Sequence, residues 1–167
     1  MTADARFGGL SRVSVAIVWA AVIVGLIHHT DHVLRVDHSG WPFRQAVNPF
    51  TFSLLAYPIL IFTLFGPARL FWLRWSLFLT GTAFTLWAHT KLETPSVQYA
   101  MWAHDRSLDA AAGAVHNLPD VQSPLLGVLA VSVSLLLNGL LAAGVLSIFL
   151  DGMRRSKPGS RDARQPM

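Results

Sequence analysis

The sequence predicts an all-α integral membrane protein built as a bundle of four transmembrane helices. Charged residues make up only 13% of the 167 residues and hydrophobic residues 53%, whereas about a quarter of a soluble globular domain is charged. Four long runs of the chain are almost free of charge, and about 20 apolar residues suffice for a helix to cross a bilayer. The runs are continuous and do not alternate in polarity, which excludes the strands of a membrane barrel.

The runs predict four membrane-spanning helices, at about 13–35, 49–66, 69–91 and 125–150. The first run carries no charge over 13–27 and then enters the polar sequence HHTDH. No small-residue cleavage site follows it, so we interpret it as a retained span and not as a signal peptide. Asn48-Pro49 supplies a cap and a first-turn proline for the second run, and Pro124 precedes the fourth.

The connection between the third and fourth runs is long for a helical bundle. Its residues Thr94 and Pro95 are typical of an N-cap and a first helical turn. We therefore expect a short extracytoplasmic helix across the mouth of the bundle. The whole bundle forms one domain, 1–156, and the basic segment 157–167, rich in Ser, Pro and Gly, is predicted to be a disordered cytoplasmic tail.

The basic residues predict the orientation in the membrane. Nine of the 13 lysines and arginines lie before the first run, at the start of the third run where it joins the second, or after the fourth. Basic residues concentrate on the cytoplasmic side, so both termini are expected in the cytoplasm of a multi-pass cell-membrane protein. The bases are spread over short segments beside the membrane, which indicates the lipid bilayer as partner and argues against nucleic acid.

The chain has no cysteine, which excludes disulfides, thiolate metal sites and cysteine nucleophiles. Phosphate-binding loops, dinucleotide fingerprints and serine-hydrolase motifs are also missing from the sequence. Candidate chemistry is therefore confined to the histidines and carboxylates.

All seven histidines fall at the extracytoplasmic ends of the predicted helices or in the outer connections. They are His28, His29, His32, His38, His89, His104 and His116. A surface location is the favoured interpretation for His29 and His38, and a solvated loop face for His104, which lies beside Asp105 and Arg106. His28, His32 and His89 fall into a helical pattern.

Residues three, four and seven positions apart share one face of a helix. The first run carries such a polar stripe: His28, Asp31, His32 and Arg35. The third run carries another: Thr82, Thr85 or Leu86, His89 and Glu93. Because both runs lead outward, His32 and His89 are expected at similar depth, facing the bundle interior and not lipid.

These residues predict a metal site at the outer mouth. His28, His32 and His89 are the expected primary ligands, with Asp31 and His116 as further ligands. Neutral imidazoles and carboxylates suit Zn, Cu or Fe. Asp31 can instead form a simple ion pair with Arg35 four residues later.

A catalytic site would also need a general base, and Asp31 and Glu93 are the candidates. The string His28-x-x-Asp31-His32 is similar to the H-x-x-E-H pattern of the inverzincin metalloproteases, with Asp in place of Glu. His28-His29-x-x-His32 resembles one histidine box of the membrane desaturases, enzymes that use several such boxes. Each resemblance covers five residues and assigns no family.

Two other functions remain open on the sequence. A b-type haem between the first and third helices would use His28 or His32 opposite His89 as axial ligands. Alternatively, the chain is a non-enzymatic accessory, sensing or assembly protein with interfacial histidines. Gly139 and Ala143 in the fourth run suit homo- or hetero-oligomer contacts, and Asn138 requires a hydrogen-bond partner inside the membrane.

Overall fold

The computed structural model describes residues 3–35, 52–106, 108 and 116–156 and is all-α apart from one short strand pair. Strands β1 (Ala3–Asp4) and β2 (Leu10–Ser11) pair antiparallel and flank a 3-10 turn, η1 (Ala5–Phe7). The helices are α1 (Arg12–Arg35), α3 (Ala56–Phe65), α4 (Phe71–Lys91), α5 (Pro95–Ala103) and α6 (Pro124–Arg155), with a second 3-10 turn, η2 (Ala68–Leu70).

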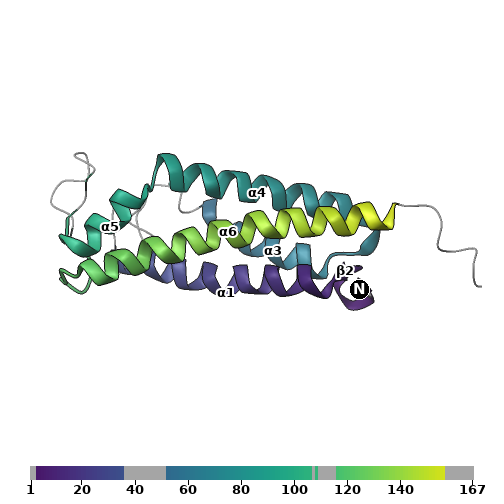
Figure 1. Cartoon of the computed structure of the whole chain (residues 1–167), viewed down its shortest axis with the longest axis horizontal. Coiled ribbons are helices and arrows are strands. Elements are labelled where there is room, and N and C mark those ends of the chain that lie inside the picture. The colour runs from purple at the N-terminus through teal and green to yellow at the C-terminus, as the bar shows by residue number, and fades with distance from the viewer. Residues whose placement is uncertain (1–2, 36–51, 107, 109–115, 157–167) are drawn as a thin grey trace, which may run out of the picture.

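Helices α1, α3, α4 and α6 run along the long axis of the molecule, and α5 lies at one end, where α1 and α4 end and α6 begins (Figure 1). Helix α6 packs against α1, α4 and α5, while α3 packs against α4 and α1. We call the end that carries α5 the α5 end. The N-terminus and the C-terminal end of α6 lie together at the opposite end (Figure 1).

Local sequence signals explain where α5 and α6 begin. The Thr94 side chain accepts a hydrogen bond from the Val97 N–H, and Pro95 occupies the first turn of α5. Ser123 caps α6 in the same way, accepting from the Leu126 N–H ahead of Pro124. The expected helix between the third and fourth runs is thus present and ends at Ala103.

The four expected spans are not all confirmed. Within the described ranges, α1 and α6 are the two helices that are both long and apolar enough to cross a membrane. Helix α4 has 21 residues but falls short in apolar composition, and α3 is an apolar helix of only 10 residues. Pro58 lies in the first turn of α3, where a proline without an N–H is tolerated. The Asn48-Pro49 cap lies outside the described residues.

The hydrophobic core lies along the axis of the bundle and is narrow. Its largest members come from all four long-axis helices: Val18, Leu60, Leu64, Phe71, Phe78, Leu137, Leu141 and Ile148. The outward faces of α1 and α6 are apolar too, with Ile23 and Leu26 on α1 and Leu135 and Leu136 on α6 all more than half exposed. Large apolar side chains therefore fill the interior of the bundle and also lie on the outward faces of α1 and α6.

Buried polar groups fix the end opposite α5. The Arg74 side chain is 1% exposed and donates hydrogen bonds to the carbonyls of Thr63, Phe7 and Gly8. The Asp151 carboxylate accepts from the Ser11 N–H at 2.8 Å and from the Ser14 hydroxyl at 2.6 Å. Together these contacts hold the N-terminal turn against α3, α4 and α6.

Gly8 has a φ of +59°, a conformation that costs an L-residue about 1–2 kcal/mol. A Cβ at this position would also collide with the Arg74 guanidinium and the Gly66 carbonyl. We expect Gly8→Ala to lower the free energy of unfolding by more than about 1 kcal/mol, measured by thermal melting in detergent. Gly139→Ala is the control, because a Cβ there meets nothing within 4 Å. Equal melting temperatures for the two variants would contradict this explanation of the turn.

Candidate metal centre

The centre begins with two histidines on one face of α1. His28 and His32 are four residues apart, so both side chains point to the same side of the helix. Both are buried, with exposed fractions of 2% and 7%. A buried polar stripe at the end of an otherwise apolar helix requires polar partners from neighbouring elements.

The partners come from the end of α4 and the residues just after it. His89 lies in the last turn of α4, and Glu93 lies between α4 and α5. The N–H groups of Leu92 and Glu93 both bond to the Ala88 carbonyl, at 2.8 and 2.9 Å. This closed turn brings the Glu93 carboxylate back toward His89 and toward the α1 histidines.

Four potential ligand atoms therefore converge, from His28, His32, His89 and Glu93, which we call the histidine–glutamate cluster. The Nε2 atom of His28 lies 3.0 Å from that of His89 and 3.2 Å from that of His32. Glu93 Oε2 lies 2.8 Å from His32 Nε2 and 4.0 Å from His89 Nε2. Donor atoms bound tetrahedrally at about 2.0–2.1 Å from a metal are roughly 3.3 Å apart. The spacing of the cluster is close to that geometry.

Hydrogen bonds cannot use all three short contacts of the histidine–glutamate cluster at once. Each imidazole nitrogen offers either one hydrogen or one lone pair. His28 Nε2 faces two nitrogens, and His32 Nε2 faces both His28 and the Glu93 carboxylate. Two-centre hydrogen bonds can therefore satisfy at most two of these three contacts. A cation at the centre accepts a lone pair from each atom at once.

Helix α6 orients His89 through the ring nitrogen that does not face the cluster. The Nδ1 atom of His89 lies 2.9 Å from the Asn138 side-chain oxygen and 3.4 Å from the Ser134 hydroxyl. When Nδ1–H donates to Asn138, the Nε2 lone pair faces the cluster, which is the usual arrangement behind a metal-bound histidine. Asn138 thus has the partner that its place in an apolar helix requires, and Gln98 of α5 donates to Ser134 at 3.1 Å.

An arginine pairs with both carboxylates beside the cluster. Arg35 is fully buried and contacts Glu93 with one nitrogen while its Nε donates to Asp31 at 2.6 Å. Burial raises the pKa of Glu93, but the nearby charges of His32 and Arg35 lower it by more, so the Glu93 pKa lies well below its ordinary value. The permanent positive charge of Arg35 thus favours the ionised Glu93 carboxylate, the form that binds a metal ion.

The structure corrects the expected role of Asp31 as a ligand. The Asp31 side chain lies outside the histidine–glutamate cluster. One carboxylate oxygen accepts from Arg35, and the other accepts from the indole N–H of Trp102 at 2.7 Å. Asp31 thus holds Arg35 and anchors α5 to α1. Glu93, expected as a base, supplies the carboxylate of the cluster instead.

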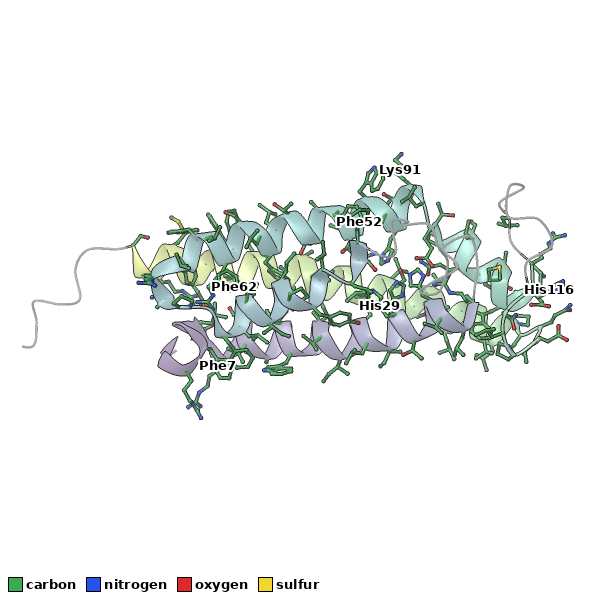
Figure 2. All side chains as sticks on the ribbon, turned by 180° about the vertical axis from the view of Figure 1, so that it is seen from behind. Phe7, His29, Phe52, Phe62, Lys91 and His116 are labelled. Carbon is green, nitrogen blue, oxygen red and sulfur yellow. The ribbon has the colours of Figure 1, made fainter. Side chains whose placement is uncertain are left out.

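His116 lies outside the histidine–glutamate cluster and belongs to a second group with Asp105 and Asp120, whose potential ligand atoms also lie within 4.8 Å of one another. It lies at the far end of the bundle (Figure 2), where its Nδ1 is 2.7 Å from the Asp105 carboxylate. That hydrogen bond raises the pKa of His116 and lowers the pKa of Asp105. His104 caps the C-terminal end of α5, and its ring contacts Tyr99. His38 lies outside the described residues.

His29 points away from the cluster but is not a surface residue, contrary to expectation. Its Nδ1 lies 2.9 Å from the Gly25 carbonyl and 2.8 Å from the Tyr57 hydroxyl, and its Nε2 lies 2.9 Å from the Ser53 hydroxyl. No sequence signal points to Tyr57 or Ser53, because their contact with α1 is tertiary. Arg35, by contrast, was already part of the stripe that the sequence predicts with His28 and His32.

A haem does not fit the same residues. Two axial nitrogens on opposite sides of one iron are separated by two bonds of about 2 Å, with the porphyrin plane between them. His28 and His89 Nε2 are 3.0 Å apart, and all four ligand atoms lie within 4.8 Å of one another. The cluster is thus suited to a single ion, which the buried residues His28, His32, His89 and Glu93 could hold.

No family model, no curated protein and no solved structure matches this chain. The interpretation of the site rests on its geometry.

Proposed function

We propose that the chain is an integral membrane metalloprotein that binds one divalent transition-metal ion in the histidine–glutamate cluster. The observation that carries this proposal is the convergence of three imidazole nitrogens and one carboxylate oxygen within 4.8 Å inside the bundle. With neutral histidines, Glu93, Asp31 and Arg35 leave the site with one net negative charge. A divalent cation would reverse that charge and fill the centre of the cluster.

The donor set limits the choice of metal. Three nitrogens and one oxygen without sulfur suit Zn, Cu or Fe better than Ca or Mg, which prefer oxygen ligands. His89 has the outer-shell hydrogen bond to Asn138 that metal-bound histidines usually have. When bound, such an ion supplies Lewis-acid chemistry, lowering the pKa of a coordinated water, or redox chemistry if it is Cu or Fe.

The burial of the cluster favours this proposal over an accessory protein with interfacial histidines. Interfacial histidines bond to water, whereas His28 and His89 are 2% and 8% exposed and face other histidines. Placing three imidazoles and a carboxylate together in an apolar bundle costs stability unless their charges and lone pairs are satisfied.

We also propose that the protein is multi-pass, with both termini in the cytoplasm and the α5 end outside. Support comes from α1 and α6, which are long and apolar enough to cross a membrane, and from the apolar outward faces. The bases at the end opposite α5, such as Arg12, Arg154 and Arg155, agree with this orientation.

Metal binding tests the proposed function directly. The chain, purified in mild detergent and stripped with a chelator, is expected to bind one Zn(II) per chain by calorimetry and elemental analysis. His28→Ala, His32→Ala and His89→Ala should each weaken binding by at least about 100-fold, because even the loss of an outer-shell partner costs 10–100-fold.

His29→Ala is the matched control for these variants. It removes a neighbouring histidine that hydrogen-bonds to Gly25, Ser53 and Tyr57 and whose ring lies 6.1 Å from the rings of His28 and His32, outside the converging ligand atoms. Its zinc affinity should equal that of the parent chain. Folded protein that binds no Zn, Cu or Fe, or that loses zinc equally in the His29 and His89 variants, would refute the metal site.

The orientation is testable because the chain has no cysteine. Ser96→Cys on α5 and Ser156→Cys after α6 each place one thiol at an exposed position at opposite ends of the bundle. A membrane-impermeant maleimide should label the first variant in intact cells and the second only after permeabilisation. Labelling of both thiols in intact cells, or of the second alone, would contradict the proposed orientation.

A further inference from the structure

A cavity of about 410 Å³ lies between α1, α3, α4 and α6, directly beside the histidine–glutamate cluster. Its volume lies in the lower part of the range of small-molecule binding sites, about 300–1,000 Å³. His28, His32, His89 and Glu93 form part of its wall. A molecule in the cavity would therefore touch a metal ion held by the cluster.

The cavity is polar where it meets the cluster, and its remaining wall is mostly apolar, with Ser53, Tyr57, Thr85 and Lys91 as further polar residues. The apolar part consists of Ala21 and Gly25 on α1, Leu60 on α3, Phe84 on α4, and Leu137 and Leu141 on α6. Ala21 lies seven residues before His28, which is roughly 10 Å along the helix. The apolar part thus extends two helical turns from the cluster toward the middle of the bundle.

The arrangement of polar and apolar residues in the wall determines which class of molecule the cavity can bind. An apolar cavity lined by leucine offers water no hydrogen-bond partners and stays dry. A sugar or a peptide would leave its own polar groups without partners against Leu60, Leu137 and Leu141. A molecule with one polar head and one apolar chain satisfies both ends of the cavity.

We propose that the cavity binds a single-chain lipid-soluble amphiphile whose oxygen head group coordinates the metal of the histidine–glutamate cluster. The apolar chain lies between α1, α3 and α6, past Gly25 and Leu60. Zinc-type ions with four ligands expand to five, so the head group adds to the protein ligands. This proposal rests on the proposed metal site and names the class of molecule that the site receives.

Gly25 offers a specific way to fill the cavity. A Cβ built at Gly25 meets only Leu137 Cδ1, at 3.9 Å, so a larger side chain fits the helix and extends into the cavity. Gly139 on α6 is the matched control, since it is exposed, does not line the cavity and has nothing within 4 Å of a built Cβ. Gly25→Leu and Gly139→Leu make the same change at two helical positions.

The test uses alkyl hydroxamates, which bind metals through two oxygens, on full-length protein loaded with Co(II). The visible spectrum of the cobalt reports binding of acetohydroxamate, hexanohydroxamate and decanohydroxamate, with the free aqueous concentration set by dialysis. In the parent chain the affinity should rise about three- to fourfold for each methylene that enters the cavity. Gly25→Leu should weaken decanohydroxamate binding at least tenfold and leave acetohydroxamate binding unchanged, whereas Gly139→Leu should match the parent chain.

The outcomes separate the two proposals. Protein that binds Co(II) but shows the same decanohydroxamate affinity in the Gly25 and Gly139 variants would overturn the amphiphile site and leave the metal site standing. Protein that binds no Co(II) would overturn both. If Gly25→Leu does not fold, Ala56→Leu serves in its place, because Ala56 of α3 also lines the cavity.

Discussion

The α5 end of the bundle is organised around imidazole nitrogens that face one another in an apolar interior. His28, His32 and His89 bring three Nε2 atoms together, and Glu93 adds an ionised oxygen, all buried within the bundle. Two hydrogen bonds can pair these four atoms but leave the 3.2 Å contact between the His28 and His32 nitrogens without one, whereas a single divalent ion would bind all four atoms. The other features of the α5 end follow from holding these four groups in place.

Each ligand-bearing element has a partner that fixes it. Asn138 of α6 orients His89, and Arg35 holds Glu93. Arg35 is in turn paired with Asp31, which accepts from Trp102 of α5. The short helix α5 thus ties the ends of α1 and α4 together. At the opposite end, Arg74 and Asp151 fix the N-terminal turn, so neither end of the bundle depends on apolar packing alone.

Helical periodicity carried most of what the sequence could predict about the site. The four-residue spacing placed His28 and His32 on one helix face, and the equal depth of the two helix ends placed His89 beside them. Glu93 was expected on the same face as His89, but α4 ends at Lys91 and a closed turn brings Glu93 to the cluster. Thr94 and Pro95 predicted the start of α5, because an N-cap and a first-turn proline also act on the residues next to them in sequence. The all-α fold is likewise a consequence of continuous apolar runs.

Tertiary placement decided what the sequence could not predict. Asp31 has the spacing of a ligand, but α5 brings Trp102 to it and Arg35 occupies its other oxygen. His116 is close to α5 in sequence yet pairs with Asp105 away from the cluster. The second and third runs were expected as full spans, but α3 has 10 residues and α4 is less apolar than α1 or α6.

The central claim is that one metal ion sits among three imidazoles and one carboxylate. X-ray absorption spectroscopy at the zinc edge, on the detergent-purified chain loaded with one equivalent of zinc, measures this ligand set directly. We expect a first shell of light atoms at about 2.0–2.1 Å, with outer-shell scattering from three imidazole rings. A shell of oxygen atoms without imidazole scattering would contradict the claim.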